Sequence, residues 1–310
     1  MTNNAAVPVL VTWDVDPDSW IPAEKRRRAF DAAMDMCQRQ DIRATFFVTA
    51  KLAELYLDAF EKLRAHGHEV GCHGLTHGTE ENYDRMPKDM QRRYITQATE
   101  QLQELVGDQV RAFRSPRVKT SATTLNLLAE QGYLVDSSVC SQRIDLISSN
   151  WINTGWIFSP RRPYRPDRNS AFKAGDVPIW EIPISALAVP FISSAMKALG
   201  LSAMKALFKL LYAEARRTGK PIVYLAHPVE FVGRGHKGKK KSWKSQTKRK
   251  YYTLSYVRAH GLRLRNLLYR MDAKALYNAS QELFAYMASF PDVAFMTISE
   301  YATHYLEKTT

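Results

Sequence analysis

The sequence predicts an α/β fold in which parallel strands form a barrel. Short apolar runs alternate with amphipathic segments along most of the chain, and the connections between them are short, which is typical of parallel βαβ units. The chain has 310 residues, of which 45% are hydrophobic, so it can bury a large core. This length suits a barrel. We expect residues 1–310 to form one domain, with a loop insertion at about 141–177 and a basic insertion at about 231–271.

In the first half of the chain, strands and helices follow one another regularly. Apolar runs rich in β-branched and aromatic residues predict strands at 7–15, 44–48, 69–72, 111–114 and 133–138. Apolar residues at helical spacing predict helices at 22–39, 51–66, 86–106 and 121–131. Each of the first four strands is therefore followed by a helix, as a parallel sheet requires.

The second half is less regular. Residues 141–177 contain Pro160, Pro163 and Pro166 and several Arg, and we expect them to form a loop over the site rather than part of the core. Further strands are predicted at 180–185, 221–226 and 293–297, with helices at 191–217 and from Ser299. Helix 191–217 has a wide apolar face with basic residues beside it. We interpret it as an outer helix of the barrel; the alternative is a helix lying on a membrane surface.

The net charge of +13 comes from one segment. Residues 231–271 contain thirteen Lys and Arg and no Asp or Glu, which leaves 31 basic and 31 acidic residues in the rest of the chain. A local excess of this kind indicates a partner rather than a fold. An anionic membrane surface or a pyrophosphate group would fit, and we give the same weight to a solvated loop without a partner.

Composition also indicates a compartment. The N-terminus lacks the pattern of a signal peptide, and no apolar stretch is long enough to span a membrane. The three cysteines are odd in number and lack the spacing of a thiolate zinc site, which is typical of a reducing compartment. We therefore expect a cytoplasmic protein, with the inner face of the membrane as an alternative location.

Polar residues stand where several predicted strands end. Asp14 and Asp16 are two apart at the end of the first strand, so their carboxylates can face the same side. Alone, this pattern also fits a turn or helix cap, but the carboxyl end of a strand is where α/β proteins bind ligands. Arg114 and His227 end later strands in the same way.

His73 and His77 follow the strand at 69–72. If the segment after Gly74 forms one helical turn, the two imidazoles lie on one face and can share a metal ion. Such a pair is common on exposed helices, so it needs an acidic partner, which Asp14 or Asp16 can supply. The carboxyl ends of parallel strands lie at one edge of the sheet, so we expect all these groups to share a pocket.

With these motifs in order, the chain resembles the polysaccharide deacetylase family, the NodB-homology carbohydrate esterases of family four. The resemblance extends from about residue 7 to residue 305. The motifs that carry it are T-W-D-V-D-P, H-G-L-T-H, R-S-P-R, D-S-S, L-A-H-P and F-M-T-I-S-E-Y. It implies a distorted (β/α) barrel of about seven parallel strands and the metal-dependent removal of an N-acyl group, usually acetyl, from an amino sugar.

The resemblance also implies a metal site. Asp16, His73 and His77 would hold a divalent metal, for which zinc is the first choice and iron, cobalt or nickel are alternatives. The family usually has adjacent Asp-Asp-Gly, whereas Val15 separates the two carboxylates here. Which aspartate binds the metal and which is the base therefore stays open, and we assign Asp16 as the ligand.

Catalytic roles follow in the same way. Asp14 would be the general base, Arg114 would orient it, and His227 would be the general acid. The backbone N–H after Pro116 would stabilise the oxyanion, and Arg117, where an aromatic residue is common, suggests a more anionic substrate. The pKa of His227 would be raised by Asp136 or Glu181, and the sequence gives no basis for choosing between them.

The expected substrate is an N-acylated saccharide linked to a nucleotide or to polyprenyl phosphate on the cytoplasmic side. One alternative is the hydrolysis of another amide C–N bond at the same site, such as that of a formamide or a cyclic ureide. A second alternative is a non-catalytic barrel that binds nucleic acid or another anionic polymer through residues 231–271. The presence of ligands, base and acid together argues against this second alternative, because phosphate binding requires neither Asp14 nor His227.

Overall fold

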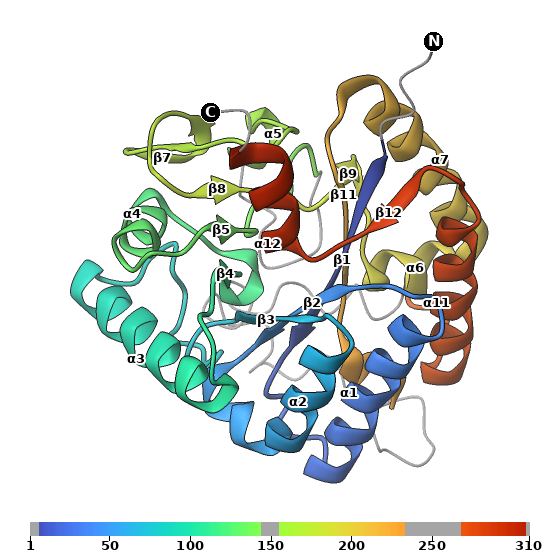
Figure 1. The fold of residues 1–310 in the computed structure, drawn as a ribbon, viewed down its shortest axis with the longest axis horizontal. Coiled ribbons are helices and arrows are strands. Elements are labelled where there is room, and N and C mark those ends of the chain that lie inside the picture. The colour runs from blue at the N-terminus through green and yellow to red at the C-terminus, as the bar shows by residue number, and fades with distance from the viewer. Residues whose placement is uncertain (1–5, 144–154, 233–267, 308–310) are drawn as a thin grey trace, which may run out of the picture.

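The computed structural model describes residues 6–143, 155–232 and 268–307. A sheet of parallel strands lies at its centre, and helices surround the sheet (Figure 1). In order across the sheet, the strands are β11 (Ile222–Ala226), β1 (Val7–Val15), β2 (Ala44–Val48), β3 (Glu69–Cys72), β4 (Ala112–Phe113), β5 (Val135–Asp136) and β8 (Trp180–Glu181). β12 (Val293–Phe295) pairs in parallel with the first residues of β1. The seven strands curl into a partial barrel, so the predicted fold class is confirmed.

Ser185 joins the two ends of this strand path. Its backbone N–H donates to the carbonyl of Val223 in β11 at 3.2 Å, and its hydroxyl accepts from the N–H of Val223 at 3.0 Å. Ser185 follows β8 in the chain, so these two bonds connect the β8 side of the sheet to β11.

The helices lie outside the strands. They are α1 (Ala23–Gln38), η1 (Ala50–Tyr56), α2 (Leu57–Ala65), α3 (Lys88–Val106), η2 (Pro116–Val118), α4 (Ala122–Glu130), α5 (Gly155–Phe158), α6 (Ser193–Leu199), α7 (Leu201–Thr218), η3 (Pro228–Phe231), α11 (Ala273–Ala288), α12 (Ile298–Tyr301) and η5 (Ala302–Leu306). The strands β1, β2 and β3 have the predicted boundaries. Helix 51–66 instead begins as the 3₁₀ segment η1, and α11 had not been predicted.

Helix 191–217 is two helices. Gly200 separates α6 from α7 with φ 89° and ψ 167°, a conformation that a glycine adopts without strain. The apolar side of α7, which includes Met204, Phe208 and Leu211, is buried against the barrel. The predicted outer helix is therefore correct. Among the described helices, none combines the length and the apolarity of a membrane-crossing segment.

Residues 141–177 are more ordered than the sequence predicts. Besides α5, they form the antiparallel hairpin β6 (Pro166–Asp167) and β7 (Ser170–Ala174). Tyr164 exchanges two backbone hydrogen bonds with Glu181 of β8, at 3.1 and 2.8 Å, and Trp156 is fully buried. The expectation of a loop outside the core is wrong for these parts, because their aromatic residues pack inward. Residues 144–154 lie outside the described part of the chain.

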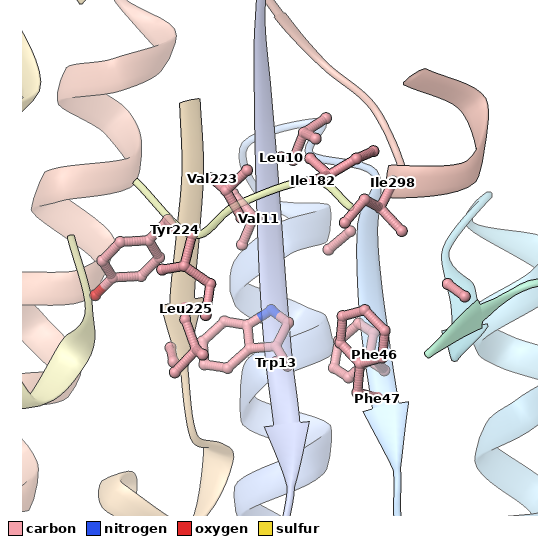
Figure 2. Close-up of a cluster of buried hydrophobic side chains, with 14 of the residues drawn as sticks. Leu10, Val11, Trp13, Phe46, Phe47, Ile182, Val223, Tyr224, Leu225 and Ile298 are labelled. Atoms are coloured by element: carbon pink, nitrogen blue, oxygen red, sulfur yellow. The ribbon is translucent and has the colours of Figure 1, made fainter. Parts of the chain in front are cut away.

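The core contains apolar side chains from neighbouring strands. Figure 2 shows Trp13 of β1 between Leu225 of β11 and Phe46 of β2. Trp13 stacks on Phe46 with 6.1 Å between ring centroids, and its indole N–H donates to Cys37 Sγ of α1 at 3.3 Å. Trp13 therefore faces the outer helices. Because side chains alternate along a strand, Thr12 and Asp14 face the barrel interior.

Candidate active site

The two aspartates end β1, as predicted. Asp14 is 3% exposed, and Asp16 follows one residue after the strand. One oxygen of Asp14, Oδ1, accepts from Arg114 Nη1 at 2.9 Å, while Oδ2 lies 3.9 Å from His73 Nε2. The carboxylate of Asp14 thus has one oxygen held by the arginine and one directed toward the imidazole.

Arg114 is fully buried and every nitrogen of its guanidinium donates a hydrogen bond. Besides Asp14, it donates to the hydroxyl of Thr12 at 2.7 Å and to the carbonyl and hydroxyl of Ser137, both at 2.7 Å. It also lies over the ring of Phe47, 4.3 Å from the centroid. Thr12 and Ser137 had not been predicted as site residues, yet they fix the arginine that holds Asp14.

His73 is buried and its tautomer is set by the backbone. Its Nδ1 lies 2.8 Å from the carbonyl of Arg114. A carbonyl only accepts, so Nδ1 carries the proton, and in the neutral ring Nε2 is left with a lone pair. That lone pair faces Asp16 Oδ1 at 3.2 Å.

His77 reaches the site from a loop, and the helical turn that was the condition for a shared metal ion in the sequence analysis does not form. Residues 73–78 form no helix, and His77 itself has φ 55°. The cause is the carboxylate of Glu81, which accepts the backbone N–H groups of Leu75, Thr76 and His77, each at 2.7 Å. In a helix, backbone N–H groups donate to the carbonyls four residues earlier and not to a side-chain carboxylate. The two imidazoles still meet, with 5.1 Å between ring centroids.

Asp16, His73 and His77 fit a metal ion. One ligand atom from each lies within 4.8 Å of the others, and they form the one such group found among the described residues. Asp16 Oδ1 lies 3.2 and 3.3 Å from the Nε2 atoms of the two histidines. Within the described part of the chain this buried oxygen has no hydrogen-bond partner. An unsatisfied oxygen facing two imidazole nitrogens is what a bound cation would explain.

The charges around these residues also favour a cation. Burial lowers the pKa of His73, but Asp14 and Asp16 raise it by more, so its pKa lies above the usual value. Burial likewise lowers the pKa of His77, to about 4, which keeps that ring neutral. Burial raises the pKa of Asp16, yet the surrounding histidines together outweigh it, so its pKa lies below the usual value. The ionised Asp16 and the neutral His77 are in the forms that bind metals, whereas a metal must displace the proton that the raised pKa of His73 favours.

His227 comes from the strand on the other side of β1. It follows β11, and its Nε2 lies 3.9 Å from Asp16 Oδ2. Its Nδ1 lies 3.9 Å from Oε2 of Glu230, which also accepts from the hydroxyl of Ser193. Burial lowers the pKa of His227, but Asp16, Glu230 and Asp14 raise it above the usual value.

Asp136 and Glu181 are not the partners of His227. The two carboxyls are fully buried on the neighbouring strands β5 and β8 and interact with each other. Asp136 accepts from the hydroxyl of Ser138 at 2.7 Å, and Glu181 accepts from the N–H of Val139 at 3.0 Å. The structure therefore assigns the position beside His227 to Glu230. A Glu three residues after a strand-end His is the signal that could have found it.

Arg117 also differs from expectation. Its guanidinium donates to the carbonyls of His77 at 2.6 Å, Gly78 at 2.9 Å and Glu81 at 3.3 Å. These bonds hold the loop of His77, so the side chain gives no support to a more anionic substrate. Pro116 begins η2, and Arg117 has φ 58° there. The oxyanion role of the N–H after Pro116 stays a prediction.

The comparisons with known proteins agree with this geometry. Residues 3–135 match the sequence model of the polysaccharide deacetylase family. The match covers the first part of the chain, and residues 3–135 are similar to this family. The resemblance predicted from the sequence is thereby confirmed, and the matched segment includes the residues from Asp14 to Arg114, whereas His227 lies beyond it. No curated protein matches the chain.

Solved structures show the same fold. A Mycobacterium smegmatis protein described as a polysaccharide deacetylase has a TM-score of 0.64 and 18% identity, covering 100% of this chain and 93% of that protein. The allantoinase Puue has a TM-score of 0.62 and 15% identity, covering 98% and 93%. A Pseudomonas aeruginosa PAO1 protein, also described as a polysaccharide deacetylase, has a TM-score of 0.57 and 14% identity, covering 98% and 94%.

Proposed function

We propose that the chain is a metal-dependent hydrolase that removes an N-acyl group, with acetyl as the first candidate, from an amino sugar. One observation carries this proposal. The ligand atoms of Asp16, His73 and His77 converge beside a carboxylate held by an arginine and beside His227. The match of residues 3–135 to the sequence model of the polysaccharide deacetylase family supports the reaction class.

When bound at this site, a divalent metal such as zinc supplies Lewis acidity toward the amide carbonyl and makes water more acidic. Asp14 is the general base. Arg114 holds its Oδ1, so Oδ2, which points toward His73, is the oxygen that takes the proton of the attacking water. This bond pattern fixes which oxygen of the carboxylate faces the metal ligands.

His227 is the general acid. The C–N bond breaks readily only when the nitrogen is protonated, because an unprotonated amine is a very poor leaving group. Glu230 beside Nδ1 and Asp16 beside Nε2 both favour the protonated imidazole. His227 therefore gives its proton to the amine, while the acyl group leaves as the carboxylic acid formed with water.

Metal analysis tests this proposal. Purified wild type, dialysed after loading with zinc, is expected to retain close to one metal ion per chain, and His73→Ala is expected to retain none. Acetate and formate release from N-acetylated and N-formylated sugar nucleotides then separates deacetylation from the deformylase alternative. Wild type that holds no zinc after reconstitution would refute the metal-dependent reaction.

The carrier of the sugar is part of the same proposal. A nucleotide or polyprenyl phosphate on the cytoplasmic side would match the positive charge of residues 231–271, of which 233–267 lie outside the described residues. Co-sedimentation with anionic vesicles should decrease as salt rises if this segment meets a membrane. Filter binding with RNA and duplex DNA tests the alternative of an anionic-polymer binding protein.

A further inference from the structure

We propose that Glu81 and Arg117 form a clamp that presets the metal loop, residues 75–78, so that His77 meets Asp16 and His73 before any ion arrives. This inference rests on the proposed metal-dependent function. It assigns a positioning role to two residues that are not themselves expected to bind the metal.

Glu81 holds the N–H side of the loop. The carboxyl group is fully buried, and each of its contacts is a donor. Oε1 accepts from the N–H of Leu75 at 2.7 Å and from the hydroxyl of Tyr83 at 2.9 Å. Oε2 accepts from the N–H groups of Thr76 and His77 and from the Thr76 hydroxyl. With both oxygens used in this way, Glu81 serves the loop and is not a fourth metal ligand.

Arg117 holds the carbonyl side. Its Nη2 donates to the carbonyls of His77 and Gly78, and its Nη1 donates to the carbonyl of Glu81. The backbone of His77 is therefore bound on its N–H by a carboxylate and on its carbonyl by a guanidinium. Charge-assisted hydrogen bonds of this kind are stronger than neutral ones.

The loop needs such a clamp because it has no regular secondary structure. Gly74 has φ 74° and His77 has φ 55°, so the segment cannot be held by a helical or strand ladder. A ligand on an unrestrained loop must be ordered when the metal binds, and that ordering lowers affinity. Fixing the backbone of His77 in advance removes this cost.

The variant Glu81→Gln tests the clamp sharply. Whichever way the amide turns, its NH₂ group faces at least one backbone N–H of the loop, because both carboxylate oxygens accept such groups. The matched control is Glu80→Gln, which removes the same charge from the adjacent residue. Glu80 is exposed and accepts a hydrogen bond from the Thr76 hydroxyl at 3.1 Å, with no contact to the backbone N–H groups that Glu81 holds.

The measurement is zinc affinity by competition with a chelator, made on folded protein well below the unfolding temperature of each variant. Removal of groups that orient metal ligands usually weakens affinity by about 10- to 100-fold. We expect this loss for Glu81→Gln and less than about threefold for Glu80→Gln. The absorption spectrum of the Co²⁺ protein should change in Glu81→Gln, since a displaced His77 alters the coordination.

A second variant tests the same clamp if Glu81→Gln does not fold. Arg117 is half-buried, and Arg117→Gln removes its hydrogen bonds to the carbonyls of His77 and Gly78. We expect this variant to weaken zinc binding by about tenfold. Wild-type affinity in the folded variant, or an equal loss in Glu80→Gln, would overturn the clamp while leaving the proposed function intact. Wild type that binds no zinc would overturn both.

Discussion

The buried carboxyls of Asp136 and Glu181 predict that the free energy of unfolding falls as the pH rises. Burial raises the pKa of Asp136 to about 6 and raises that of Glu181 well above its usual 4.5. The folded protein keeps protons that the unfolded chain releases, so this stability is complete below about pH 4 and is lost as pH rises through the folded pKa values. Each such group contributes a slope of about 1.4 kcal/mol per pH unit.

The variant Glu181→Gln isolates this effect. Because burial and the neighbouring Asp136 raise the pKa of Glu181 well above its usual value, wild type loses about 1.4 kcal/mol from Glu181 for each pH unit between the unfolded and the folded pKa of this group. The amide keeps a donor for Asp136 and an acceptor for the N–H of Val139, and it has no proton to lose. The variant should therefore lack this part of the slope.

Urea unfolding at pH 6, 7 and 8, followed by tryptophan fluorescence, measures the difference. The control is Glu130→Gln, which removes an exposed carboxylate paired with Arg92 and should leave the wild-type slope unchanged. Parallel plots of unfolding free energy against pH for wild type and Glu181→Gln would refute the raised pKa of Glu181.

Three further predictions concern the site. Asp14→Asn keeps an oxygen for Arg114 but cannot take a proton, so kcat for acetate release should fall about 10²- to 10⁴-fold with zinc content unchanged; a variant that loses its zinc would instead mark Asp14 as a ligand. His227→Gln should lower amide hydrolysis to a similar extent but affect an acetyl ester of an acidic phenol far less, because that leaving group needs no proton; equal losses would contradict the role of acid. Gly74→Ala places a Cβ against Glu81 at φ 74°, so thermal unfolding should show a loss of about 1–3 kcal/mol, and an unchanged transition would contradict the strain.

The strands that carry the site were predictable because their signals are local. β1, β2 and β3 are runs of buried residues, and their boundaries follow from the apolar pattern alone. The placement of Asp14 and Asp16 at the end of β1 then follows from the alternation of side chains. Their meeting with His73 and His227 follows from the parallel topology.

The parts that were wrong depend on contacts between distant or irregular segments. The loop of His77 looks helical by spacing, but its conformation is decided by Glu81, whose role appears only when the chain has folded back. Glu230 was missed because its approach to His227 depends on the turn η3 and on Ser193 of another helix. The position of Arg117 next to Pro116 in the sequence suggested a contact with the substrate, whereas its guanidinium donates to the carbonyl of His77.

The pairing of β1 has a consequence for how the protein is made on the ribosome. The first strand is synthesised early, but its neighbours β11 and β12 come from the far end of the chain, and Thr12 bonds to Tyr224 across 212 residues. At about 5–20 residues per second, β1 waits for roughly 10–40 seconds before β11 is made. During that time the strand that carries Asp14 and leads into Asp16 has an open edge, which is a template for aggregation until the C-terminal third emerges.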